Sequence, residues 1–255
     1  MRALVPRDLE SIGVIVAFFE RTGGASEGPF SSLNGSLTGG DDRAAVLDNR
    51  RRASAALGID AYAVPGLVHG IRVDRVDAAT ATDGRDEPAR VFGGADGLYA
   101  DDPAVALGAY SGDCVIVAMA SPRQGRTALV HAGWRGLATG ILRRAVSVFD
   151  DPTDVRVAIG PAIGPCHYEV GAEVVDAVRA AVPDPPVRRA SGRTFLDLAG
   201  STGSALRAAG VRSIADSGVC TACEIGRFFS YRTERRTGRH LALTARLDRP
   251  DILRL

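Results

Sequence analysis

The architecture of the chain is clearest in residues 105–136, which read VALGAYSGDCVIVAMASPRQGRTALVHAGWRG. Two apolar runs, VALGAY and CVIVAMA, flank the turn Ser111-Gly112-Asp113, and a third run, TALV, ends in HAGWRG. Short aliphatic runs between glycine-containing turns are typical of β-strands. The residues that follow, 137–149, carry apolar side chains at helical spacing. This part of the chain therefore predicts consecutive strands that lead into a helix.

Further elements are predicted on both sides of this stretch. They are strands at 13–19 and 155–160, and helices at 43–57, 171–181 and 198–209. The polar segment 74–90 is expected to be an exposed excursion. Strands and helices alternate without a regular βαβ rhythm, which indicates a mixed α/β fold with sheet in the centre. No shift in composition marks a boundary, so we expect a single domain over residues 1–255.

The composition excludes several classes of protein. All 31 basic residues among the 255 are arginine, so a Schiff-base lysine and a phosphate-loop lysine are both ruled out. A net charge of +1 argues against a broad nucleic-acid-binding face. No targeting segment or membrane-spanning run is evident, and four irregularly spaced cysteines suggest reduced thiols. We therefore expect a cytoplasmic protein that binds neither nucleic acid nor membrane.

Two of the four histidines stand at the ends of apolar runs, just before glycine-containing loops. They are His69 in VHG and His131 in HAGWRG, and Cys114 follows a turn in a similar position. Two imidazoles and one thiolate with an open fourth position have the ligand chemistry of a catalytic zinc site. The alternative is two hydrogen-bonded core histidines and one core cysteine.

HAGWRG joins a strand to a helix and places Arg135 between two glycines. Exposed amides beside a guanidinium would form an anion site suited to phosphate. Alternatively, the motif is a tight turn in which Trp134 packs in the core and Arg135 forms a surface ion pair.

The pair Cys220 and Cys223 forms a CxxC motif. It could be half of a structural zinc site if Cys166 and His167 supplied the other half, or it could be a packed turn. The signature of zinc nucleobase deaminases is missing, because Ile71 stands where that motif has glutamate.

Two further segments are candidates for binding substrate. Residues 22–42 are rich in glycine and serine but keep apolar anchors, which indicates an ordered binding loop. Arg21 and Asn34 are the candidate contacts there. The segment FFSYRTERRTGR, residues 228–239, is either a solvated edge strand and turn or a wall of the site, with Arg232 facing the ligand.

Taken together, these motifs resemble the multicopper polyphenol oxidoreductase (laccase-like) family, also called the peptidoglycan-editing-factor or purine nucleoside phosphorylase family. The matching segments are GGASEGPFSSLN, VLDNRRRASAALGI, VHG, ADGLYADDPAVALGAYSGDC, HAGWRGLATGIL, AIGPAIGPCHYEVG and CTACEIGRFFSYRTERRTGR. They follow the order of the family and cover nearly the whole chain.

The resemblance implies a layered sandwich of central mixed sheets flanked by helices, with His69, Cys114 and His131 as metal ligands. It also implies zinc-dependent phosphorolysis of adenosine, inosine and methylthioadenosine, and deamination of adenosine. The chain departs from the family pattern at Leu67, where glutamine is usual, and at His167, where a second cysteine is common. The departure at Leu67 bears on substrate preference, and neither departure replaces one of the three implied metal ligands.

We therefore expect an enzyme that acts on a purine nucleoside and phosphate. Phosphate would bind near Arg135, Asp113 would carry a proton during deamination, and the catalytic group would include the three metal ligands. One alternative is a copper-dependent phenol oxidase, although four histidines are few for multicopper clusters. Others are a cell-wall precursor hydrolase that uses Cys114, and a binding module with a purely structural metal. The sequence does not indicate the oligomeric state.

Overall fold

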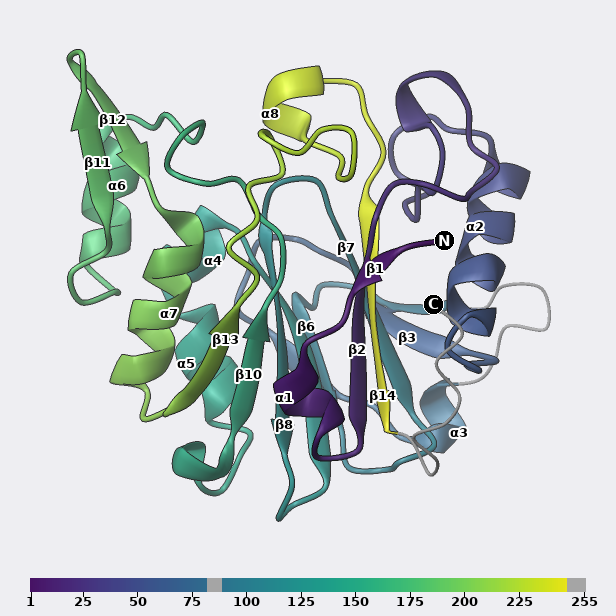
Figure 1. Ribbon diagram of the computed structural model, residues 1–255. Helices are drawn as coiled ribbons and strands as arrows, with labels where there is room; N and C mark the ends of the chain where they lie inside the picture. The colour runs from purple at the N-terminus through teal and green to yellow at the C-terminus, as the bar shows by residue number, and fades with distance from the viewer. Residues whose placement is uncertain (82–88, 247–255) are drawn as a thin grey trace.

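The computed structural model of the chain describes residues 1–81 and 89–246. Within these residues it forms two six-stranded sheets that pack face to face, with helices on both outer faces (Figure 1). This is the layered α+β sandwich that the family resemblance implied. No helix in the described ranges is long and apolar enough to cross a membrane.

The first sheet has the strand order β1-β2-β14-β7-β3-β5. Its strands are β1 (Ala3–Leu4), β2 (Val14–Phe19), β14 (His240–Arg246), β7 (Ala106–Ser111), β3 (Tyr62–Pro65) and β5 (Ala89–Phe92). Strand β14, the last described strand, lies between β2 and β7 and is antiparallel to both. Strand β3 is parallel to its two neighbours, so the sheet is mixed.

The second sheet has the order β13-β10-β8-β9-β6-β4. Its strands are β13 (Ser213–Asp216), β10 (Arg156–Ile159), β8 (Val115–Ser121), β9 (Arg126–Ala132), β6 (Gly97–Ala100) and β4 (Val73–Arg75). Strands β10 and β13 are parallel, whereas β8 and β9 form an antiparallel hairpin. A separate hairpin of β11 (Val187–Ala190) and β12 (Arg193–Leu196) projects beside it.

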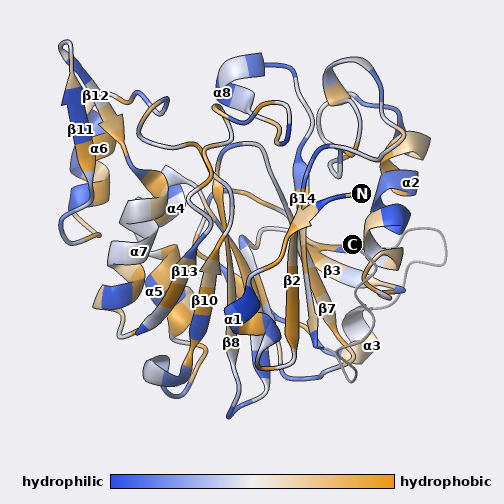
Figure 2. Cartoon of the chain, in the orientation of Figure 1, coloured by the Kyte–Doolittle hydropathy of each residue, from blue (hydrophilic) through white to orange (hydrophobic). Residues whose placement is uncertain are grey.

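The central strands are apolar along their whole length because both of their faces are buried. In β2, Val14, Val16 and Phe18 point into the core between the sheets. The intervening Ile15, Ala17 and Phe19 pack in the core under helix α2 (Arg43–Ala55), together with its residue Ala53. Figure 2 accordingly shows the strands in the middle of the molecule as largely hydrophobic.

Several helices cover the outer face of the second sheet. They are α4 (Trp134–Thr139), α5 (Ile141–Val146), α6 (Ala172–Arg179) and α7 (Leu198–Ala208). The helix expected over 137–149 is divided, because Gly140 adopts φ 92°, a left-handed conformation that ends a helix. The remaining short helices are α1 (Arg7–Glu10), α3 (Ala78–Ala81) and α8 (Tyr231–Glu234), with 3-10 turns at Gly28–Phe30 and Pro152–Asp154.

Two predicted segments differ from the expectation. Residues 228–239 do not form an edge strand: Phe228 and Phe229 are fully buried, and α8 follows them. The segment 74–90 contains parts of β4 and β5 as well as α3, and its residues 82–88 lie outside the described ranges. The loop 22–42 is ordered, as predicted, and Asn49 of α2 donates hydrogen bonds to Ser26 and to the carbonyls of Ser32 and Asn34.

Candidate functional site

Three predicted residues converge at one end of the two sheets. His69 follows β3, Cys114 lies in the turn between β7 and β8, and His131 is near the end of β9. One ligand atom from each lies within 4.8 Å of the others. The Cys114 sulfur is 3.9 Å from Nε2 of His69, and the two imidazole rings meet edge to face with centroids 4.9 Å apart. We call these residues the three-donor cluster.

Backbone geometry allows this close approach. His69 has a φ of 61°, in the left-handed region that residues other than glycine rarely adopt. At Gly133, a Cβ atom would lie 2.9 Å from Cδ2 of His69 and 3.1 Å from the Cys114 sulfur. Only glycine fits at that position without displacing one of these two side chains. The glycine of HAGWRG is therefore part of the construction of the cluster.

Asp96 ties the two histidines together, and sequence reasoning did not single it out. Its Oδ1 accepts a hydrogen bond from the backbone amide of His69 at 2.8 Å and lies 3.1 Å from Nδ1 of His131. Its Oδ2 accepts from the amide of Gly70 at 2.6 Å. Burial opposes ionisation of this carboxyl, yet the hydrogen bonds from His131, Gly70 and His69 hold its pKa below the ordinary value. In the sequence, Asp96 appears only within the family segment ADGLYADDPAVALGAYSGDC, and no role was predicted for it.

The cluster favours a thiolate beside a protonated imidazole. Burial alone would raise the pKa of Cys114, but His131 and His69 lower it to about 6. Burial alone would lower the pKa of His131, but Cys114 and Asp96 raise it to about 9. His69 is exposed and Cys114 is half-buried, which does not match the alternative of inert core residues.

The cluster opens into a cavity of about 310 Å³. Besides the three donors, its walls are formed by Ser36, Thr38, Leu67, Tyr110, Ser111, Gly112, Tyr231 and Arg239. They combine aromatic rings, hydroxyl groups and one guanidinium, a mixture typical of a small-molecule site. A larger cavity of about 430 Å³ beside α4, α5 and α7 is lined mainly by alanine and leucine, with Arg143 as its one charged residue, and it holds no comparable chemistry.

Arg239 and Tyr231 were not predicted as site residues. The guanidinium of Arg239 lies over the Tyr231 ring, 5.3 Å from its centroid, and donates to the carbonyls of Thr237 and Gly238. Burial lowers the pKa of Arg239, although a guanidinium stays charged near neutral pH. The arginine-rich segment 228–239 was recognised as a candidate with Arg232 facing the ligand, but Arg239, not Arg232, is the arginine of this segment that lines the cavity.

Arg135 and Arg232 both lie near Tyr168. The Arg232 guanidinium is 5.0 Å from the centroid of the Tyr168 ring and donates to the carbonyl of Glu169. Burial and the nearby Cys114 raise the pKa of the Tyr168 hydroxyl, while Arg232 and Arg135 oppose the shift. Arg135 is exposed and also lies over the Trp134 ring at 4.5 Å. Neither arginine lines the cavity, but both lie near Tyr168, and we call them the cationic edge.

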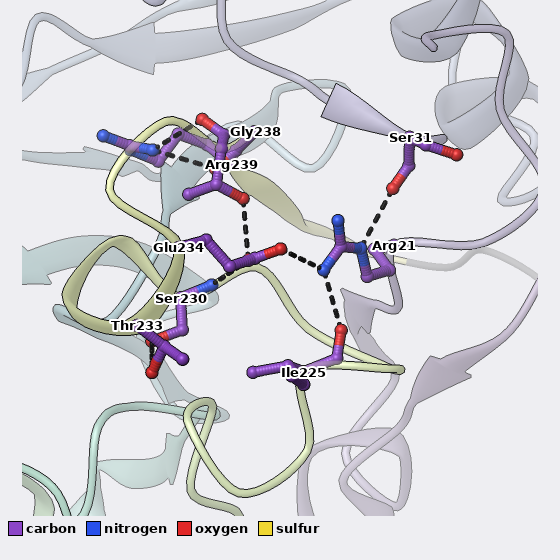
Figure 3. A network of polar contacts seen from close by, with 9 residues as sticks. Arg21, Ser31, Ile225, Ser230, Thr233, Glu234, Gly238 and Arg239 are labelled. Atoms are coloured by element: carbon purple, nitrogen blue, oxygen red, sulfur yellow. Dashed lines mark hydrogen bonds and ion pairs between the residues drawn. The ribbon is translucent and has the colours of Figure 1, made fainter. Parts of the chain in front are cut away.

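Arg21 and Asn34 do not line the cavity. Arg21 donates to the carbonyls of Ser31 and Ile225 and pairs with Glu234 at 2.9 Å (Figure 3). Asn34 is buried, and its Oδ1 accepts from the amides of Ser36 and Arg239. Both side chains are thus engaged within the protein. Asn34 positions two residues that do line the cavity.

Asp113 is likewise engaged on both carboxylate oxygens. Thr221 donates to Oδ1 at 2.7 Å, and the amide of Arg232 donates to Oδ2 at 2.6 Å. Burial raises its pKa despite these bonds. The contacts suit a residue that positions the turn bearing Cys114 better than one that carries a proton to substrate.

Comparison with known proteins agrees with this fold and site. A family model described as multi-copper polyphenol oxidoreductase laccase matches residues 15–246. The chain is 40% identical over 248 residues to "Purine nucleoside phosphorylase YlmD" of Geobacillus stearothermophilus, covering 92% of this chain and 90% of the relative. It is 32% identical to "Purine nucleoside phosphorylase YfiH" of Escherichia coli, covering 93% and 96% of the two chains.

Solved structures show the same likeness. The crystal structure of YlmD from Geobacillus stearothermophilus superposes with a TM-score of 0.86 at 39% identity, covering 92% of this chain and 93% of that one. A Bacillus licheniformis protein described as hypothetical protein YfiH superposes with a TM-score of 0.85 at 32% identity, covering 91% and 92%. From the matched motifs, the shared fold and these relatives, the chain belongs to the multi-copper polyphenol oxidoreductase laccase family, several members of which are named purine nucleoside phosphorylases.

Proposed function

We propose that this chain is a zinc-dependent purine nucleoside phosphorylase. The observation that carries the proposal is the three-donor cluster at the mouth of a cavity with aromatic, hydroxyl and guanidinium groups. The names of the relatives supply the reaction class. The catalytic group comprises His69, Cys114 and His131.

The donor set fits a divalent transition metal. His131 uses Nδ1 toward Asp96, which leaves Nε2 for a metal, and such a carboxylate–histidine pair is the usual support of a metal-bound imidazole. Three protein donors leave the fourth position of a tetrahedral zinc ion for substrate. Bound there, the ion would supply a Lewis acid at the end of the cavity. Copper accepts the same donors, so metal analysis is part of the test.

The cavity walls suit a nucleoside. We propose that the purine stacks on Tyr231, and that the hydroxyls of Ser36, Thr38 and Ser111 face the ribose. Arg239 would hold an anionic oxygen from one side of the cavity. The cationic edge of Arg135 and Arg232 would hold phosphate from the other. Because α4 has six residues and hence a weak dipole, phosphate binding rests on these arginines rather than on the helix amides.

The reaction exchanges one bond at the anomeric carbon of the ribose. A phosphate oxygen forms a bond to that carbon while its bond to the purine nitrogen breaks, and a proton goes to the departing purine. Arginines that fix phosphate in line with the anomeric carbon would lower the barrier chiefly by orientation. The Tyr168 hydroxyl, whose pKa is raised, keeps its proton and can donate to a phosphate oxygen beside Arg232.

The arrangement of the histidines gives less support to the alternative of a copper-dependent phenol oxidase. All four histidines lie in the described ranges, but only His69 and His131 meet at one place. His240 is buried within β14, and His167 stands among cysteines elsewhere. A mononuclear copper centre fits the three-donor cluster, whereas a histidine-rich multicopper group does not form.

The test incubates metal-quantified protein with adenosine, inosine or methylthioadenosine and inorganic phosphate. Phosphorolysis releases the free purine and a pentose 1-phosphate in equal amounts, whereas deamination of adenosine takes up water, releases inosine and ammonia, and consumes no phosphate. Arg239→Gln should raise the KM of at least one substrate about tenfold or more, because it removes a charged hydrogen-bond donor. The exposed Arg207→Gln is the matched control. Phenol oxidation without phosphorolysis by zinc-loaded protein would contradict the proposal.

A further inference from the structure

A second group of metal-binding side chains lies outside the cavity. Cys166 and His167 lie in the loop after β10, and Cys220 and Cys223 lie in the loop after β13. Because β10 and β13 are parallel neighbours, both loops leave the sheet at the same end. A β-bridge between Ala162 and Cys220 continues the pairing into the loops. We call these four residues the four-donor cluster.

The spacing of the donor atoms matches a tetrahedral zinc site. Nδ1 of His167 lies 3.3 Å, 3.8 Å and 3.5 Å from the sulfurs of Cys166, Cys220 and Cys223. The sulfurs of Cys166 and Cys223 are 3.4 Å apart. Zinc bonds of about 2.3 Å to sulfur and 2.0 Å to nitrogen separate tetrahedral donors by about 3.5–3.8 Å. The four atoms already surround a space of that size.

The surroundings support ligand binding. The amide of Gly164 lies 3.2 Å from the Cys220 sulfur and can donate to it, the kind of outer hydrogen bond that orients a metal-bound thiolate. A Cβ atom at Gly164 would lie only 3.4 Å from the sulfurs of both Cys166 and Cys220. Arg188 donates to the carbonyl of Pro165, which places a cation near the negative charge of three thiolates.

A disulfide or a thiol redox pair explains these contacts less well. Either would need two cysteines, whereas here a third sulfur and a ring nitrogen converge on the same point. Four protein donors fill every position of tetrahedral zinc, as in structural sites. Cys166, His167 and Cys223 are also exposed and Cys220 is half-buried, and none of the four lines the cavity described above.

We propose that Cys166, His167, Cys220 and Cys223 bind a structural zinc ion that joins the two loops. Binding releases the thiol protons and fixes each loop at two points. The joined segments carry Tyr168 on one side, and Thr221 and Arg232 on the other. Thr221 and the Arg232 amide both hold Asp113, next to Cys114. The ion thus fixes the outer support of the three-donor cluster without meeting substrate, and it does not depend on the reaction that the cavity performs.

Metal content of protein purified under reducing conditions tests the proposal. We expect two zinc ions per chain in the wild type, one in Cys114→Ser, one in Cys223→Ser, and none in the double variant. An unchanged zinc content in Cys223→Ser would overturn the proposal, whereas a single zinc ion that is kept in Cys114→Ser and lost in Cys223→Ser would show that only the three-donor cluster is empty. Since each single variant removes a different ion, failure of the first site and failure of the second are distinguishable.

Two further measurements cover the case in which Cys223→Ser does not fold. His167→Cys should keep the second zinc ion because it replaces one donor by another, whereas His167→Ala should bind it more weakly. In cobalt-substituted wild type, the thiolate-to-cobalt absorption should correspond to four thiolates per chain. A band that corresponds to one thiolate, together with an oxidised bond between Cys166 and Cys223, would show a redox pair and overturn the proposal.

Discussion

The two clusters use the same kinds of side chain but differ in number, support and surroundings. The three-donor cluster draws its residues from loops and strands of both sheets, and buried Asp96 holds its histidines from behind. The four-donor cluster draws its residues from two adjacent loops, is largely exposed, and has the Gly164 amide near one sulfur as its outer support. Three donors facing a cavity leave room for substrate, whereas four donors at the surface leave none. On the roles proposed above, the number and position of the donors distinguish a catalytic metal site from a structural one.

The largest expected effect concerns activity. Cys114→Ser should lower kcat/KM for phosphorolysis by about a thousandfold, since a bound metal contributes several kcal/mol to the transition state. Cys223→Ser should lower it by about tenfold or less, through looser support of Asp113. Steady-state kinetics on both variants measure the difference. Equal losses would remove the functional distinction between the clusters.

The same two variants should affect thermal stability in the opposite order. A structural ion at about a thousand times its Kd contributes about 4 kcal/mol to folding. Cys223→Ser should therefore lower the melting temperature by about 10 °C. Cys114→Ser should lower it by less than half as much, because Asp96 and the strands already hold the other two ligands. Calorimetry of metal-loaded proteins checks the order, and a larger drop for Cys114→Ser would reverse the assignment.

Asp96 tests how far the three-donor cluster depends on its support. Asp96→Asn removes the charge but keeps the shape, and it should weaken metal binding at this cluster by about 10- to 100-fold. The zinc ion at the four-donor cluster should be unaffected. Asp74→Asn, which alters an exposed ion pair with Arg72, is the matched control. Competition with a chromogenic chelator measures both affinities, and identical results for the two variants would contradict the role of Asp96.

The smallest expected effect concerns how the free energy of unfolding depends on pH. It separates destabilisation by protonation of a buried histidine from destabilisation by loss of metal in acid. His240 is buried, its Nδ1 has no hydrogen-bond partner among the described residues, and burial and Arg239 lower its pKa to about 3. Its unfolded-state pKa is about 6.5, so the unfolded chain binds the proton more readily and stability falls as the pH drops from about 6.5 toward 3.

Between pH 7 and pH 6, this group should cost about 0.7 kcal/mol of unfolding free energy. In His240→Phe this pH-dependent loss of unfolding free energy should be absent. Urea unfolding at the two pH values, in chelator so that metal release does not contribute, measures it. The same pH dependence in both proteins would show that His240 does not titrate as its surroundings imply.

Much of the sandwich could be predicted because apolar runs and helix boundaries are local properties. The strand at 13–19 and the helices at 171–181 and 198–209 agree with β2, α6 and α7 within a few residues. The burial of Phe228 and Phe229, where an edge strand was one expectation, depends on packing between distant segments. Periodicity along the sequence does not contain that information.

The site was predictable to a similar degree. Motifs before glycines identified His69 and His131, and the structure brings them to Cys114. Asp96 could not be found in this way, because its role arises only where β6 and β9 pair and the loop after β3 folds over them. Arg21 was chosen from its place beside the binding loop, but its partners, Ile225 and Glu234, come from the far end of the chain.

The position of β14 between β2 and β7 has a consequence for how the protein is made. Both neighbours of β14 are synthesised long before it. During synthesis, the edge of β2 and the edge of β7 that pair with β14 therefore stay unpaired until β14 emerges. Pairing between segments so distant in sequence is slow, because loop closure comes before the contacts that reward it. Tyr231 and Arg239 precede β14 directly, so the cavity wall and the centre of the first sheet are completed in the same late event. A nascent chain therefore completes the wall of the cavity only when the sheet itself becomes continuous, and until then the unpaired edges of β2 and β7 are open to aggregation.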